Sequence, residues 1–319
     1  MPVAPAAPEA TPETLLEALL AKLSRRVRAD GAALAQPGET EPSVEATVWL
    51  ALALRVVGGP AAERSQTVGE AVARMQAADG RVSASPLHPG AYSPTSIAIL
   101  AWHGRPEFAA ARRGAVAFLL AHAGEHFPRL PASPLDMDTD LTGWPWIDRT
   151  YSWAEPTALA LLALESAGEG EHLRAREGRA LLLDRQIGSG GWNYGNAQVF
   201  GSELRPTPES TGLVLAALAG RAPETAVAAS LAYLARVGPA LRTPLALGWA
   251  SLGRAAWRQG SDDPDDADDP NNPELAIRET LARESRYGSY ETADLALLAV
   301  AAVAAHSPRG LLTALGARA

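Results

Sequence analysis

The segment between Gly124 and Thr157 concentrates side chains that could carry chemistry. It brings carboxyl groups and electron-rich rings into one stretch: Asp136, Asp138, Asp140, Trp144, Trp146, Tyr151, Trp153 and Glu155. Carboxyl groups beside such rings suit two reactions. One is protonation of an alkene, after which the rings stabilise the carbocation. The other is cleavage of a glycosidic bond by paired acids, with tryptophan rings stacked on the sugar.

We therefore predict that the catalytic candidates are Glu155, Asp138 and Asp140. The predicted substrate-binding residues are Trp144, Trp146, Trp153 and Tyr151. A structural interpretation stands beside each assignment. Glu45, Glu155 and Glu209 each precede a threonine by two residues, as acids favourably placed at a helix N-terminus would. The aspartates from Asp136 to Asp140 could bind a divalent cation through oxygen or form a solvated loop, and we predict no metal.

Two other groups of polar residues are predicted to lie on the surface. The acidic run Asp262–Asp269 is interrupted and followed by prolines, so a solvated loop is expected at about 260–273. His122 and His126 have helical i, i+4 spacing but no third ligand nearby. The chain contains no cysteine, which excludes disulfides and thiolate metal sites. No cofactor is predicted.

The elements that must position these residues recur along the chain. Apolar segments begin near Thr47, Thr95, Thr157, Thr211, Pro244 and Thr292. Each follows a more charged, amphipathic stretch, and alanine and leucine dominate the composition, which favours helix. The segments are apolar on nearly all sides, as helices buried on every face should be. The sequence therefore predicts an all-α protein built from helical hairpins.

Glycine recurs in one frame of each unit. The positions are Gly31, Gly80, Gly124, Gly190, Gly238 and Gly288. An open solenoid of hairpins would leave one face of its inner helices exposed, whereas these segments are apolar throughout. We therefore predict an α/α toroid, an (α/α)6 barrel of six hairpins in two concentric layers. It forms a single domain over 13–319, with a long insert at about 125–156 that caps one mouth of the ring.

A motif supports this architecture. The fourth unit reads Gln186-x₃-Gly190-x-Trp192, and the second has Gln76 and Gly80 in the same frame with Val82 replacing tryptophan. The other units keep only the glycine, with Ala33, His126, Ala240 and Tyr290 at the aromatic position. We interpret the motif as structural. Glycine permits the sharp turn, the glutamine amide bonds a neighbouring helix, and the tryptophan packs on that amide.

This motif resembles the repeat of squalene–hopene cyclases and of the wider terpene cyclase and prenyltransferase superfamily, over about residues 14–305. The resemblance implies a toroid with an isoprenoid in its central cavity. Class II terpene cyclases carry D-x-D-D directly before an inner-helix threonine, with the middle aspartate as proton donor. Here the four residues before Thr157 end in Ala154-Glu155-Pro156, so Glu155 alone matches as an acid. The zinc site of the similar protein prenyltransferases needs a cysteine, which this chain lacks.

Charge and hydropathy limit the partners. The formal charge is 28 − 36 = −8 with no basic stripe, so no nucleic acid partner is expected. Residues 1–12 are predicted to be disordered and do not resemble a signal peptide, and no transmembrane segment is expected, so a cytoplasmic location is predicted. The preferred function is binding, and acid-initiated cyclisation, of an apolar isoprenoid. The alternatives are a non-catalytic toroid that binds a lipid or a protein, and a carbohydrate-active (α/α)6 barrel. The oligomeric state is not predicted.

Overall fold

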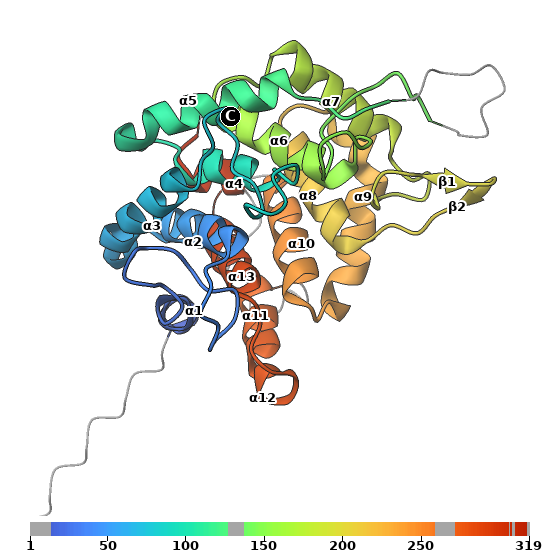
Figure 1. The fold of residues 1–319 in the computed structure, drawn as a ribbon. Helices are drawn as coiled ribbons and strands as arrows, with labels where there is room; N and C mark the ends of the chain where they lie inside the picture. The colour runs from blue at the N-terminus through green and yellow to red at the C-terminus, as the bar shows by residue number, and fades with distance from the viewer. Residues whose placement is uncertain (1–13, 127–136, 259–271, 306, 308–309, 318–319) are drawn as a thin grey trace, which may run out of the picture.

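The computed structural model describes residues 14–126, 137–258, 272–305, 307 and 310–317. Helices dominate this part of the chain, so the predicted all-α class is confirmed (Figure 1). Strands β1 (Gln198–Val199) and β2 (Ser202–Glu203) form a small antiparallel hairpin at the surface. The predicted N-terminal disorder and most of the acidic loop at about 260–273 fall on residues outside the described ranges.

Six helices are buried on nearly all sides. They are α2 (Val44–Val57), α4 (Pro94–Ala101), α6 (Ala154–Ser166), α8 (Pro208–Leu218), α10 (Pro244–Ala256) and α13 (Thr292–Ala304). Four of them begin one to three residues before the predicted threonine. A proline or a side-chain cap fixes the first turn of α2, α4 and α8. Ser43 caps α2 by accepting from the Ala46 N–H, and Thr207 caps α8 by accepting from the Ser210 N–H.

The buried helices contact one another in sequence order. Helix α2 packs on α4, α4 on α6, α6 on α8, α8 on α10, α10 on α13, and α13 returns to α2. Hydrogen bonds join the two ends of this circuit. Arg26 Nη1 donates to the carbonyl oxygen of Tyr290 over 2.7 Å, and the Thr292 N–H donates to the carbonyl oxygen of Ala35 over 2.9 Å. The contacts among the buried helices are therefore closed, as the sequence predicted.

Six amphipathic helices each contact one or two of these buried helices. They are α1 (Leu15–Ser24), α3 (Ala62–Arg74), α5 (Ala109–Ala121), α7 (Leu173–Asp184), α9 (Glu224–Val237) and α11 (Pro273–Ala282). In Figure 1, α3, α5, α7 and α9 lie at the periphery around α2, α4, α6, α8 and α10. Short helices complete the described elements: η1 (Gly59–Ala61), η2 (Pro106–Phe108), η3 (Gly238–Ala240), α12 (Glu284–Tyr287) and α14 (Leu311–Ala314).

The recurring glycines form sharp turns at only some of the predicted positions. Gly80 and Gly190 have φ angles of 96° and 98°. A Cβ at either one would collide with a carbonyl oxygen, that of Gly114 in α5 or that of Ala229 in α9, so no other residue type fits there. The frame differs at Gly238, which has φ −46° and begins η3, and Gly124 does not have a positive φ.

Candidate functional site

A cavity of about 280 Å³ lies where the N-terminal ends of the six buried helices converge. Its carboxyl groups come from Glu45, Glu155, Glu209, Glu291 and Asp294. Its aromatic rings come from Trp49, Trp146 and Trp249, and its larger aliphatic side chains from Val48, Ile97, Leu159, Leu213, Leu245 and Leu297. The volume is roughly twice that of the ~150 Å³ apolar cavity that holds one benzene, so on the order of ten to fifteen carbon atoms fit.

The acids and the apolar side chains occupy different depths of this cavity. Glu155 lies in the first turn of α6, and Leu159 follows four residues later on the same face. The same spacing separates Glu45 from Trp49 in α2 and Glu209 from Leu213 in α8. One helical turn rises about 5.4 Å. The cavity therefore has an acidic rim at its mouth and an apolar floor one turn deeper.

Glu155 is half-buried in the wall between α6 and α8. Ser210 Oγ donates a hydrogen bond to Glu155 Oε1 over 2.6 Å, and Thr207 Oγ1 donates in turn to Ser210 Oγ over 2.9 Å. Burial raises the pKa of Glu155, the bond from Ser210 lowers it, and the nearby charge of Glu209 raises it. The net direction is upward, which favours the protonated form that a proton donor needs.

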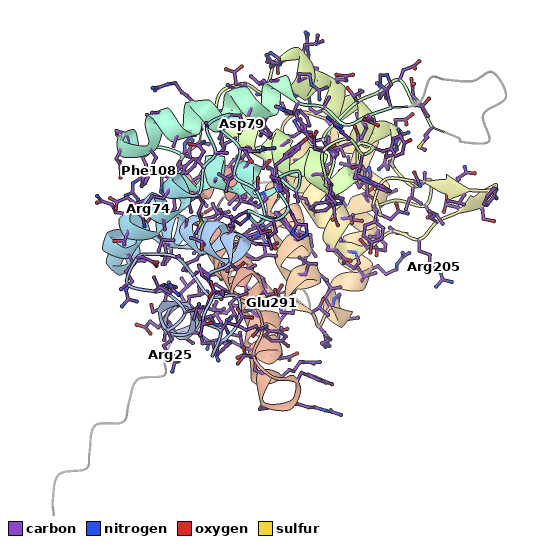
Figure 2. All side chains as sticks on the ribbon, viewed as in Figure 1. Arg25, Arg74, Asp79, Phe108, Arg205 and Glu291 are labelled. Carbon is purple, nitrogen blue, oxygen red and sulfur yellow. The ribbon has the colours of Figure 1, made fainter. Side chains whose placement is uncertain are left out.

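A second group of acids lies across the mouth, where α13 meets α2. Burial and the charges of Glu291 and Glu45 raise the pKa of Asp294 to about 6. The pKa of Glu45 is also raised, by partial burial of its carboxyl and by Glu291, although the residue as a whole remains exposed at the mouth. In Figure 2, Glu291 lies toward the middle of the view, whereas Arg25, Arg74 and Arg205 lie near its edges.

Arginines donate to carbonyl oxygens at the C-terminal ends of three of the buried helices. Arg112 donates to the carbonyl oxygens of Ile99 and Ser166, near the C-terminal ends of α4 and α6. Arg258 donates to the carbonyl oxygen of Ala305, directly after α13. Cations at C-terminal ends and carboxylates at N-terminal ends both complement the helix dipole. Arg112 and Arg258 therefore lie at the opposite end of the buried helices from the acids of the cavity.

The structure separates the site residues that were predicted from sequence. Glu155 and Trp146 line the central cavity. Tyr151 and Trp153 line a different pocket of about 220 Å³, together with His126 and Arg185. The aromatic residues of the insert therefore do not form one binding surface.

Asp138 and Asp140, the two aspartates predicted to be catalytic, do not line the central cavity. The N–H of Asp138 donates to the carboxylate of Asp184 at the end of α7, and the N–H of Asp140 donates to Asp138 Oδ1 over 3.0 Å. Neither side chain lines the central cavity. These are loop-stabilising bonds, so the geometry does not support the predicted catalytic role of Asp138 and Asp140. Asp136 lies outside the described residues.

Trp144 does not line the cavity either, in contrast to its predicted role in substrate binding. Its side chain is 1% exposed, and its indole Nε1 donates to the carbonyl oxygen of Leu119 over 2.9 Å. Its backbone N–H donates to Thr157 Oγ1 over 3.0 Å. Trp192 makes the same pair of bonds, to the carbonyl oxygen of Leu182 and to Thr211 Oγ1. Trp144 is therefore the third unit's equivalent of Trp192.

This equivalence corrects the register of the third unit, in which His126 was placed at the aromatic position. The insert separates Gly124 from the aromatic residue, so the spacing of the motif is lost although its contacts remain. His126 lines the second pocket instead, and His122 stacks on Phe118 at 3.9 Å between ring centroids.

The motif residues of the second and fourth units contact neighbouring outer helices. Gln76 Nε2 donates to the carbonyl oxygens of Gly80 and of Ala111 in α5, both over 2.8 Å. Gln186 Nε2 donates over 2.8 Å to Ser230 Oγ in α9, a side chain rather than a backbone group. Trp192 is fully buried. None of these residues lines the central cavity.

Two acids and two tryptophans of the cavity were not singled out from the sequence: Asp294, Glu291, Trp49 and Trp249. The two tryptophans meet edge to face across the cavity wall, with ring centroids 5.8 Å apart. Among the described residues, no group of three or more His, Asp or Glu side chains has metal-binding geometry. The Asp262–Asp269 run lies outside those residues.

No helix in the described part of the chain is long and apolar enough to cross a membrane. No protein-family model matches the sequence, and no curated protein matches it. Solved structures do match the fold.

A protein from Actinoplanes superposes with a TM-score of 0.56 at 18% identity, covering 86% of this chain and 81% of its own. A variant of the type II terpene cyclase MstE from Scytonema, in complex with geranylgeranyl dihydroxybenzoate, superposes with a TM-score of 0.58 at 13% identity, covering 95% and 97%. Another MstE variant, in complex with the product merosterolic acid A, gives a TM-score of 0.57 at 14% identity over 90% and 96%. The chain therefore shares the fold of type II terpene cyclases.

Proposed function

We propose that the protein binds an apolar isoprenoid in the central cavity and that a cavity carboxyl group begins its cyclisation by protonating an alkene. The observation that carries this proposal is the layering of the cavity, with acids one helical turn above an apolar, tryptophan-containing floor. An alkene held on that floor would have its double bond within reach of an acid at the rim. The geranylgeranyl ligand of the similar MstE structure supports the same class of ligand.

We assign the proton donor to Glu155. Its raised pKa favours the protonated form, and the chain of hydroxyls through Ser210 and Thr207 offers a route for replacing the proton. The carboxyl O–H bond would break as a new C–H bond forms, which leaves a carbocation on the neighbouring carbon. The faces of Trp146, Trp49 and Trp249 would attract that cation. Loss of a proton to a rim carboxylate would end the reaction, so that no co-reactant is consumed.

The contacts also support a finer description of the fold. We propose that residues 13–319 form one domain of six hairpins in two concentric layers, the outer helices covering the closed circuit of buried ones. The insert at about 125–156 would cap the mouth that carries the acids. Trp146 lines the cavity, which supports this cap.

One observation favours a second candidate, a toroid that binds the same kind of ligand without reacting. The hydrogen bond from Ser210 stabilises the ionised form of Glu155, and a carboxylate cannot donate a proton. No comparable observation favours a carbohydrate-active barrel, because the cavity floor is apolar where a sugar would need hydrogen-bond partners.

Product formation by the parent protein distinguishes the two candidates, and the Glu155→Gln variant tests the assigned proton donor. The protein is incubated with geraniol and with farnesol, products are identified by gas chromatography and mass spectrometry, and binding is followed by tryptophan fluorescence. Cyclase activity predicts cyclic products with the parent protein, none with Glu155→Gln, and similar binding by both. Glu279→Gln is the matched control, because it makes the same charge change on the exposed face of α11. Binding without products from the parent protein would support the non-catalytic candidate, and equal turnover by Glu155→Gln would exclude this residue as the donor.

A further inference from the structure

The charge of the central cavity is of one sign. Among the described residues that line it, five carry carboxyl groups and none is a lysine, arginine or histidine. The N-terminal ends of the six buried helices contribute roughly +0.5 of a charge each, about +3 together, against about −4 when Glu155 holds its proton and the other four carboxyl groups are ionised. The mouth therefore keeps a negative potential even after the helix dipoles are counted.

The raised pKa values are consistent with that excess. Asp294 faces Glu291 on its own chain segment and Glu45 on α2, and both charges raise its pKa. Glu209 acts in the same direction on Glu155. Among the described residues, no lysine or arginine forms an ion pair with any of these five carboxyl groups. Burial lowers the pKa of Arg26, and the charge of Glu291 is near enough to raise it, but Arg26 Nη1 donates to the carbonyl oxygen of Tyr290 and to Thr292 Oγ1 instead. A positive charge placed at the mouth would relieve these repulsions, and a negative one would add to them.

The depth of the cavity fixes which end of a ligand meets these acids. An amphiphilic molecule buries its hydrocarbon against Leu159, Leu213 and Trp249, because this surface is apolar apart from one indole N–H. Its polar end then lies one helical turn higher, at the level of Glu45 and Asp294. Trp49 lies directly below Glu45 on α2 and presents an aromatic ring to the same position.

We propose that the ligand of the cavity is a hydrophobic cation, an apolar chain of about ten to fifteen carbons that ends in an ammonium group. This inference rests on the proposed function, in that the cavity must bind an isoprenoid-like molecule. The ammonium group lies among Glu45, Glu291 and Asp294, one helical turn above Trp49, and leaves Glu155 on the opposite wall free to act on the chain. A diphosphate or carboxylate at the same position meets only acids.

Three ligands with the same ten-carbon chain test the charge of the polar end. Geranylamine, geraniol and geranyl diphosphate are titrated into the full-length protein at pH 7.5 by isothermal calorimetry. We expect geranylamine to bind at least about tenfold more tightly than geraniol, and geranyl diphosphate to bind more weakly than both. Added salt should weaken the binding of geranylamine and leave the affinity for geraniol unchanged.

The double variant Glu291→Gln, Asp294→Asn identifies the acids responsible. It should remove most of the preference for geranylamine over geraniol without changing the affinity for geraniol. Glu279→Gln, with its charge change on the exposed face of α11, should keep the full preference. Calorimetric unfolding checks that each variant is folded.

The outcomes separate this inference from the proposed function. Equal binding of all three ligands, or tightest binding of the diphosphate, would overturn the cationic ligand and leave isoprenoid binding intact. Failure of all three to bind would overturn both. An unchanged preference in the double variant would show that the amine is recognised elsewhere, which also overturns the assignment.

Discussion

Trp144 and Trp146 are two residues apart and lie on opposite sides of the same wall. Trp144 is fully buried between α5 and α7, with its indole N–H bonded to Leu119 and the guanidinium of Arg174 4.7 Å from its ring. Trp146 is half-buried and faces the central cavity. Successive side chains of an extended segment point in opposite directions, so residues i and i+2 share a side only where the backbone stays regular. Pro145 and the turn after Trp146 break that regularity.

Trp192 sharpens the contrast. It lies in another unit, yet it repeats the bonds of Trp144 to a helix carbonyl and to a threonine hydroxyl. The role of a tryptophan here is therefore set by its position relative to the buried threonine, and not by its place in an aromatic-rich stretch. We call Trp144 and Trp192 the wall tryptophans and Trp146 the cavity tryptophan. The wall tryptophans should govern stability, and the cavity tryptophan should govern ligand binding.

The largest effect is expected from the wall tryptophans. Trp192→Ala and Trp144→Ala should each lower the free energy of unfolding by roughly 3–5 kcal/mol, since both remove a fully buried indole and leave a cavity. Chemical denaturation monitored by circular dichroism measures this. Any geraniol binding should survive in the folded fraction. A loss at Trp144 of less than half that at Trp192 would break the equivalence of the two residues.

A smaller loss is expected at the threonines beneath them. Thr157→Val and Thr211→Val keep the shape of the side chain but remove the hydroxyl that accepts from the backbone N–H of Trp144 or Trp192. Each variant should lower the free energy of unfolding by about 1–3 kcal/mol. The same denaturation measurement applies, with Thr313→Val on the exposed face of α14 as the control. If either variant is as stable as the control, the shared threonine bond does not define the wall position.

Asp294 gives an effect of opposite sign that depends on pH. The pKa of Asp294 in the folded state, about 6, lies above the ordinary value of about 3.9. Between about pH 4 and 6, the folded state therefore holds a proton that the unfolded state has lost. The stability contributed by this proton is therefore lost as pH rises from about 4 to 6. Asp294→Asn should stabilise the protein at pH 7.5 by on the order of 1 kcal/mol, after allowing for screening at the open mouth.

Thermal unfolding at several pH values measures the effect of Asp294→Asn. The difference from the parent protein should shrink toward zero near pH 4, where the carboxyl is protonated in the folded state. A difference that does not change with pH would mean that Glu45 and Glu291 do not act on Asp294 as described.

The smallest effect on stability is expected at the cavity tryptophan. Trp146→Ala removes a half-buried ring that borders open space, so the free energy of unfolding should change by less than about 1 kcal/mol. The affinity for geraniol should fall, because part of the apolar wall is lost. A destabilisation as large as that of Trp192→Ala would make Trp146 a wall residue, and unchanged affinity would remove it from the binding site.

The fold was predictable because its signals are local and repeated. The apolar segments near Thr47, Thr157 and Thr211 became buried helices, and the turns at Gly80 and Gly190 needed a residue without a Cβ. The register of the third unit was not predictable by spacing, because its insert moved the tryptophan away from Gly124. Only the hydrogen bond to Thr157 identifies Trp144 as the equivalent residue.

The site was predicted in part, for a reason rooted in helix geometry. Acids two residues before a threonine were recognised at Glu45, Glu155 and Glu209. Asp294 lies two residues after Thr292, and so was passed over. Positions four residues apart lie on the same helix face, about 40° apart around the axis, so an acid on either side of the threonine reaches the same cavity.

The closure of the buried helices has a consequence for how the chain folds. Arg26 and Tyr290, which join the two ends of the circuit, are 264 residues apart. An open array can grow one repeat at a time from any starting point, but the last contact of a closed one forms only when its most distant units meet. Bringing such ends together costs about 5 kcal/mol in chain entropy, which short-range contacts cannot repay. Folding should therefore be slow for an all-helical protein and strongly cooperative, with the cavity absent from every intermediate in which α2 and α13 have not yet joined.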